Sequence, residues 1–267
     1  MELQSLGIAI LSMGSMGALF SSGLALANKK LHVEEDPRVI TLLELLPGAN
    51  CGGCGYPGCS NFAENVIAGE CKVSDCPVSD EETVMEMAAA LGIEAEIGEA
   101  MYPVLFCQGS ISNALTHAEY LGILSCIGAK VNNGADKDCE YGCYGFGDCV
   151  EACTFGALQM SAEGLPILNE SLCSGCGQCV EACPQQLIEL HPKSHQVFVL
   201  CKNQDTPKTA KSVCSAACFG CSICARKTDN EAITMLGNLA IVHHDRLENT
   251  ESIPFDKCRT GALVKRQ

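Results

Sequence analysis

The chain has 267 residues, 21 of which are cysteine, and a formal net charge of −15 at pH 7. This length allows two or three small domains and excludes a single large enzyme core. The acidic balance, the few aromatic residues and the absence of a basic stripe exclude a nucleic-acid-binding surface.

The N-terminal segment is apolar and carries no charged residue from Leu3 to Asn28. Residues 6–27 read LGIAILSMGSMGALFSSGLALA, which is as long as the roughly 20 residues that cross a bilayer as a helix. Lys29 and Lys30 follow at once. By the positive-inside rule, residues 1–30 predict a single-pass anchor in the cytoplasmic (inner) membrane, with the N-terminus outside and the bulk of the chain cytoplasmic.

Two other interpretations of this segment stay open. Ala25-Leu26-Ala27 resembles a signal-peptide cleavage site, which would make the mature protein a soluble, ferredoxin-like carrier. A signal peptide usually begins with basic residues, whereas this chain begins Met-Glu, and export would place reduced thiolates in an oxidising space. A buried helix of a soluble domain is disfavoured because the segment has no polar face.

Residues 31–92 predict a small, mostly helical domain. A short amphipathic helix starts at Pro37 and ends before Pro47-Gly48, and a later acidic helix takes Ser79 as its N-cap. Between them lies a cysteine group with many glycines, which allow tight turns and close backbone approach. Four thiolates are what one [4Fe–4S] cluster needs, whereas zinc is the alternative occupant. Cluster 1 is assigned to Cys51, Cys54, Cys59 and Cys76.

Residues 138–191 predict a two-cluster ferredoxin domain, after a connecting segment at 93–137 whose structure the pattern does not define. The motif Cys149-Val-Glu-Ala-Cys153 recurs unchanged as Cys179-Val-Glu-Ala-Cys183, and Glu163-Gly164 predicts a hairpin turn between the copies. A two-cluster ferredoxin domain has two runs of four cysteines each, and three cysteines of a run bind one cluster while the fourth binds the other cluster. Cluster 2 is therefore assigned to Cys139, Cys143, Cys149 and Cys183, and cluster 3 to Cys153, Cys173, Cys176 and Cys179.

Residues 192–267 predict a degenerate ferredoxin-like unit. Its first run has Thr228 at the fourth position, and Leu247, Thr250 and Ile253 stand where a second run would carry cysteines. Because the fourth cysteine of each run ligates the other cluster, the cysteines that remain form the complete ligand set of one cluster, and the cysteines that are missing would form the complete set of the second. Cluster 4 is assigned to Cys218, Cys221, Cys224 and Cys258.

Five cysteines lie outside these four sets. Cysteine is often a buried free thiol, and Cys71 has the features of an ordinary substitution. The other four are either free thiols or the ligands of a fifth cluster assembled by the fold: Cys107, Cys126, Cys201 and Cys214. The sequence thus predicts four [4Fe–4S] clusters, with a fifth as a candidate, and the overall class is α+β with βαβ-type ferredoxin units.

No catalytic residues emerge from the sequence. The chain lacks a P-loop and a dinucleotide-binding glycine motif. His243-His244 has no carboxylate partner pattern and is expected on the surface.

Three stretches resemble one known family. They read DPRVITLLELLPGANCGGCGYPGC, GCYGFGDCVEACTFGAL and CSGCGQCVEACPQQLIEL, and together with the N-terminal anchor they resemble the B subunit of the Rnf ion-translocating electron-transport complex. The resemblance covers nearly the whole chain. It implies an oxidoreductase component that performs no substrate chemistry itself, accepts electrons from reduced soluble ferredoxin on the cytoplasmic side, and passes them to other subunits of the complex.

Alternatives to this function remain open at the level of sequence. A similar complex keeps a redox-sensing transcription factor reduced, and a cysteine-rich scaffold could bind zinc without redox chemistry. An acidic ferredoxin would also need a local basic surface on this acidic chain. The candidate cations are Lys202, Lys208, Lys211, Arg226, Lys227, Lys257 and Arg259, which could equally form a solvated face.

Overall fold

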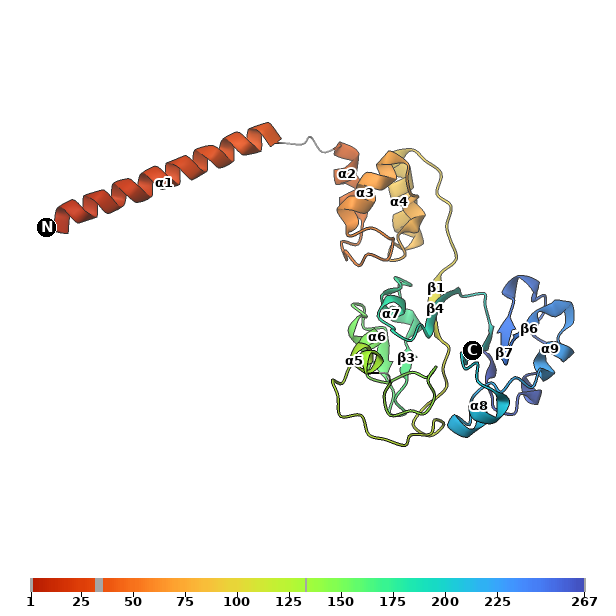
Figure 1. The fold of residues 1–267 in the computed structure, drawn as a ribbon. Coiled ribbons are helices and arrows are strands. Elements are labelled where there is room, and N and C mark those ends of the chain that lie inside the picture. The colour runs from red at the N-terminus through yellow and green to blue at the C-terminus, as the bar shows by residue number, and fades with distance from the viewer. Residues whose placement is uncertain (1, 32–35, 133, 267) are drawn as a thin grey trace.

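The computed structural model describes residues 2–31, 36–132 and 134–266. The expected segments 1–30, 31–92, 93–137 and 192–267 each include residues outside this part of the chain, namely 1, 32–35, 133 and 267. Within the described residues, α1 projects away from the remaining elements, which form a helical domain and two small mixed units (Figure 1).

Helix α1 spans Glu2–Leu31 and, within the part of the chain that the structure describes, projects away from the other elements (Figure 1). Its large apolar side chains are exposed, with Leu11 at 75% and Phe20 at 69%. By length and composition, Ile10–Lys30 is the candidate membrane span in the described residues. Such a stretch is consistent with a lipid environment, because an apolar helix without a protein partner would expose its whole surface to water. The expected anchor at 6–27 overlaps this span.

The helical domain comprises α2 (Pro37–Leu45), α3 (Cys59–Ala68), the 3₁₀ turn η1 (Val73–Asp75) and α4 (Glu81–Leu91). Leu42, Phe62 and Met87 come from the three α-helices and are fully buried in one core. The start of α2 is as expected, since Asp36 caps it ahead of Pro37. The expected cap of α4 was wrong by one residue, because the side chain of Asp80 accepts the hydrogen bond from the Thr83 amide.

The first mixed unit contains α5 (Cys126–Val131), α6 (Asp148–Glu151), η2 (Glu170–Leu172) and α7 (Gln178–Glu181). Strand β1 (Met101–Leu105) pairs antiparallel with β4 (Ile188–Pro192), and β2 (Leu158–Met160) pairs antiparallel with β3 (Pro166–Leu168). The predicted hairpin is therefore confirmed. Strand β1 and helix α5 come from the segment expected to be a connector, which instead forms part of this unit.

The second mixed unit contains α8 (Pro207–Val213), α9 (Ile223–Lys227), η3 (Asp229–Glu231), η4 (His244–Arg246) and η5 (Phe255–Lys257). Its strands form two further antiparallel pairs, β5 (Val197–Val199) with β8 (Leu263–Lys265) and β6 (Ile233–Leu236) with β7 (Leu239–Val242). Ile253 is buried in this unit's core, so an aliphatic side chain fills one of the positions where a second run would carry cysteine.

Every strand pair in the described part of the chain is antiparallel and two-stranded. The α+β class agrees with this arrangement, but the described residues contain none of the parallel crossovers that a βαβ unit requires. Two pairs, β2–β3 and β6–β7, are hairpins, whereas β1–β4 and β5–β8 join strands that are far apart in the chain.

Candidate functional site

Twenty of the cysteines gather into five groups of four. We name the groups in the order in which they neighbour one another. Site A contains Cys51, Cys54, Cys59 and Cys76. Site B contains Cys153, Cys173, Cys176 and Cys179. Site C contains Cys126, Cys143, Cys149 and Cys183. Site D contains Cys107, Cys139, Cys201 and Cys214. Site E contains Cys218, Cys221, Cys224 and Cys258.

Site A lies on the cysteine loop of the helical domain, as expected. Cys59 is the first residue of α3, and its amide donates to the side chain of Asn50 at 2.9 Å. Cys76 is buried, and the core residue Phe62 lines the same cavity. Cys71 does not line this cavity; its thiol lies 3.9 Å from the Phe62 carbonyl oxygen.

The three cysteine runs share one backbone conformation. Each run has two residues with positive φ, placed on either side of its central position. They are Gly145 and Gly147 in the first run, Gly175 and Gly177 in the second, and Gly220 and Ser222 in the third. The runs can therefore be superposed position by position, and the first run then reads Cys143-x2-Phe146-x2-Cys149, with phenylalanine where the second run has Cys176.

This register explains one correction to the expected ligand sets. Cys139 was expected beside Cys143, Cys149 and Cys183, but the structure places Cys126 there and Cys139 in site D. The carboxylate of Asp148 accepts hydrogen bonds from the amides of Cys126 at 2.7 Å and Ile127 at 3.0 Å. This contact brings the start of α5 to the loop that lacks its central cysteine.

Site D is assembled from segments that are far apart in the sequence. Asn203 is 1% exposed and makes two hydrogen bonds to cysteine sulfurs, both at 3.4 Å. Its side-chain Nδ2 donates to Cys139, and its backbone N–H donates to Cys201. The amides of Gly109 and Cys143 donate to the Cys107 sulfur at 3.3 and 3.4 Å. The candidate fifth set is thus brought together with one member exchanged, Cys139 for Cys126.

Site E has the expected members. The thiols of Cys218, Cys221 and Cys258 are the electrostatic neighbours of Cys224. Cys258 is followed by the same kind of turn as Cys153 and Cys183, which are the fourth cysteines of the first two runs. In each case the third residue after the cysteine has a positive φ, and these residues are Gly156, Gln186 and Gly261. The sulfurs of Cys153, Cys183 and Cys258 each also accept an amide hydrogen bond at 3.3 to 3.4 Å from four or five residues later.

Neighbouring sites are in direct contact through the first half of the row. The Gln178 side chain donates to the Cys51 carbonyl, and a Cβ on Gly53 would lie 2.7 Å from the Cys176 carbonyl oxygen, so sites A and B abut. Cys149 of site C and Cys179 of site B are buried in one small core.

The second half of the row is joined in the same way. The Cys143 amide bonds to the Cys107 sulfur, linking site C to site D. The Lys137 ammonium donates to the carbonyl oxygens of Gly109 at 2.6 Å and Cys143 at 2.9 Å in the same region. Cys201 of site D packs against the core that also contacts Cys218, Cys224 and Cys258 of site E. The spatial order is therefore A, B, C, D, E.

Burial disfavours the thiolate form of several cysteines in these sites. Burial raises the pKa of Cys143, Cys149 and Cys201 to about 12 and that of Cys179 to about 11. Neighbouring thiols add to the shift, because several negative charges would otherwise share a small volume. A metal centre that replaces the protons relieves this cost, so ligation and proton release are coupled.

The donor sets fit [4Fe–4S] clusters. Each cavity at sites A to D is bordered by four cysteines, which is one thiolate for each of the four irons. Amide N–H groups directed at the sulfurs are also the contacts that tune the potentials of iron–sulfur clusters.

Family models match both cysteine-rich regions. The FeS model, which describes an Fe–S cluster domain, matches residues 46–78. A model described as a 4Fe-4S dicluster domain matches residues 138–188. The matched ranges contain all the cysteines of sites A and B and three of the four in site C, with Cys126 outside them. The chain binds iron–sulfur clusters.

Curated relatives cover nearly the whole chain. The B subunit of the Na(+)-translocating ferredoxin:NAD(+) oxidoreductase complex of Acetobacterium woodii is 37% identical over 94% of this chain and 75% of its own length. The B subunit of the ion-translocating oxidoreductase complex of Methanosarcina acetivorans is 36% identical over 90% of both chains. The B subunit of the proton-translocating ferredoxin:NAD(+) oxidoreductase complex of Clostridium ljungdahlii is 37% identical over 93% of this chain and 88% of its own length. With this identity extending over 90 to 94% of its length, the chain belongs to the family of B subunits of Rnf-type ion-translocating oxidoreductase complexes.

Proposed function

We propose that this chain holds five [4Fe–4S] clusters at sites A to E, accepts electrons from reduced ferredoxin at site E, and delivers them from site A to the membrane part of its complex. Membership of the family makes it an iron–sulfur electron-transfer subunit. The observation that carries the finer proposal is the unbroken row of contacts from site A to site E. When bound, the clusters supply one-electron redox chemistry, and the order of the cysteine groups is the order of the relay.

Electron entry is proposed at site E because it is the most accessible end of the row. Among the twenty-one cysteines, all of which lie in the described residues, only Cys221 is exposed. Arg226 donates to the Cys221 carbonyl at 3.3 Å, and Lys227 follows it at the end of α9. Lys227 and Arg259 are exposed and close in sequence to Cys224 and Cys258.

These cations suit an acidic electron donor. The chain as a whole carries a net charge of −15, so an acidic protein would be repelled from most of its surface. A local positive face over the exposed ligand gives such a donor one favoured orientation. Two of the relatives are named as components of ferredoxin:NAD(+) oxidoreductase complexes, and ferredoxin is the donor that we propose here.

Electron exit is proposed at site A because its domain follows α1 most closely in the chain. The helical domain begins at Pro37, six residues after the end of α1 at Leu31. Lys29 and Lys30 lie in the last turn of α1, and they support an orientation with the N-terminus outside and sites A to E in the cytoplasm. Site A then lies at the membrane end of the row.

Metal and sulfide analysis of the full chain tests the number of clusters. Five clusters contain about 20 irons and as many acid-labile sulfides, and four contain about 16. A chain purified without oxygen should give the higher value. Abundant zinc without sulfide would contradict the electron-transfer proposal and favour a zinc scaffold.

A charge-reversal experiment tests docking at site E. The double variant Lys227→Glu, Arg259→Glu should oxidise reduced ferredoxin about 10-fold more slowly than the wild type at low salt, and the difference should shrink as salt is raised. The matched control is Lys193→Glu, Lys265→Glu, which makes the same charge change at two other exposed positions. Equal rates in the two double variants, at unchanged iron content, would contradict docking at site E.

A further inference from the structure

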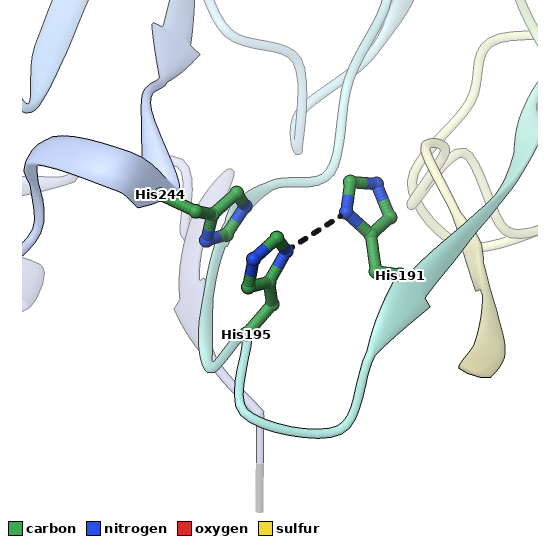
Figure 2. A group of neighbouring side chains, drawn as sticks. All are labelled: His191, His195 and His244. Carbon is green, nitrogen blue, oxygen red and sulfur yellow. Dashed lines mark hydrogen bonds between the residues drawn. The ribbon is translucent and has the colours of Figure 1, made fainter. Parts of the chain in front are cut away.

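Three histidines that the cysteine sites do not use come together at the junction of the two mixed units (Figure 2). His191 lies in β4, His195 lies in the turn between β4 and β5, and His244 begins η4. Each offers one ring nitrogen, and these three nitrogens lie within 4.8 Å of one another. His244 was expected on the surface, but its imidazole is half-buried and stacked on His195.

We infer that His191, His195 and His244 form a binding site for one zinc-class divalent transition-metal ion, which links the first mixed unit to the second. The site is separate from the cysteine groups. Nothing in the electron-transfer role requires it.

The chemistry of the donors selects the class of ion. Imidazole nitrogens suit zinc and neighbouring transition metals, whereas magnesium and calcium require oxygen ligands. The Nδ1 atoms of His191 and His195 are 3.2 Å apart. Two nitrogens bound to one tetrahedral zinc at 2.0 to 2.1 Å are separated by about 3.3 to 3.4 Å, so these two already have nearly the required spacing.

The surroundings of His191 complete a pattern found at histidine metal sites. Its Nδ1 faces His195, while its Nε2 is buried and makes no hydrogen bond within the described part of the chain. The carboxylate of Glu189 lies 3.5 Å from that Nε2. Metal-bound histidines usually donate their second ring N–H to a carboxylate, which fixes the tautomer and the ring orientation. A small approach of Glu189 would establish that bond.

The third ligand requires a modest change of conformation. The rings of His195 and His244 are parallel within 4°, with centroids 3.7 Å apart. The lone pair of an imidazole lies in the plane of its ring, so two parallel rings do not point at one ion. Binding therefore requires the His244 ring to tilt out of the stack, and Phe198, whose ring centroid is 5.2 Å away, borders the space in which it moves.

The charges around the cluster allow a cation to bind. Burial lowers the pKa of His191 and lowers that of His244 to about 4, so both imidazoles are neutral and free to ligate near pH 7. Asp245 follows His244, and Glu189 lies beside His191. Arg266 also acts on His191, but its guanidinium is paired with Glu170 at 2.7 Å.

Zinc binding to the full chain, with its clusters loaded, tests the inference. After chelator treatment and equilibration with one equivalent of Zn²⁺, the wild type should retain about one zinc per chain. X-ray absorption at the zinc edge should show nitrogen or oxygen neighbours at about 2.0 Å and no sulfur at about 2.3 Å. Sulfur neighbours would place the zinc on cysteines and overturn the inference, as would failure of the wild type to retain zinc.

Histidine variants give the second arm of the test. His195→Ala and His244→Ala should each weaken zinc binding at least about 100-fold, since loss of an outer contact alone costs 10- to 100-fold. His243→Ala is the matched control, because His243 adjoins the site in sequence but bonds to Thr234. Iron content reports folding in each variant; if His244→Ala loses iron, His195→Ala in the exposed turn decides the result. Zinc retention by His195→Ala equal to that of the wild type would overturn the inference.

Discussion

The exchange of Cys126 for Cys139 gives the sharpest prediction, because it distinguishes the geometry from the spacing of the sequence. The change is Cys126→Ala, which removes one of four thiolates from site C and leaves a side chain that cannot ligate. With five sites of about four irons each, the total should fall from about 20 to between about 16 and 19, depending on whether three thiolates retain a smaller cluster. Iron and sulfide analysis with EPR spectroscopy of the reduced chain measures the loss.

A second substitution should reverse the loss. Phe146 occupies the position that Cys176 holds in site B, on a backbone with the same pair of positive φ angles. The thiol of Cys126 also lies near the Phe146 amide, which lowers the pKa of that thiol against the rise caused by burial. The double variant Cys126→Ala, Phe146→Cys should therefore return to about 20 irons, because the new thiol enters the same site.

The controls decide between the two ligand assignments. Cys139→Ala should also lose iron, but Phe146→Cys should not restore it, since Cys139 belongs to site D. Phe146→Cys alone should keep all its iron, with a loss of stability of about 1 kcal/mol because Phe146 packs on Tyr120 at 5.4 Å between ring centroids. Rescue of Cys139→Ala in place of Cys126→Ala would refute the reasoning from geometry.

Three further predictions concern single residues in or near the sites. Gly53→Ala places a Cβ 2.7 Å from the Cys176 carbonyl oxygen, so it should destabilise the contact between sites A and B by about 1 to 3 kcal/mol and slow electron arrival at site A in stopped-flow EPR, with iron content unchanged. Lys137→Met removes a cation that stabilises the Cys143 thiolate, so the reduction potentials of the clusters at sites C and D should fall. Unit charges about 8 Å apart at an effective dielectric constant of about 20 interact by about 2 kcal/mol, which corresponds to roughly 90 mV for a one-electron step. Unchanged potentials in a redox titration would contradict this prediction. Cys71→Ala should keep the full iron content, and a loss of four irons would show that this thiol is a ligand.

Local spacing predicted the sites whose ligands are close in the chain. The glycine-rich loop of site A and the run at Cys173, Cys176 and Cys179 place their thiols by short turns, and short turns are encoded by nearby residues. The missing cysteines of the last unit were equally informative. The structure places Cys258 with Cys218, Cys221 and Cys224 in site E, and the core takes up Ile253.

The apolar N-terminal helix was also readable from the sequence alone. Its length and lack of charge are properties of one continuous segment, so they require no knowledge of long-range contacts. The starts of α2 and α4 show the limit of such local reasoning, since the start of α2 was predicted and the cap of α4, Asp80, was missed by one position. Adjacent serine and aspartate are both good caps, and the hydrogen bond chooses between them.

Tertiary structure alone decided sites C and D. The sequence offered Cys107, Cys126, Cys139, Cys201 and Cys214 as thiols with wide or irregular spacing, and spacing along the chain favoured Cys139 for site C. The exchange depends on Asp148 holding the start of α5 and on Asn203 joining Cys139 to Cys201, which are contacts between segments that are distant in the chain. The histidine cluster arises in the same way, because His244 meets His191 and His195 only when the two mixed units pack together. Spacing determines what a short turn can bring together, whereas distant ligands meet only through the folded chain.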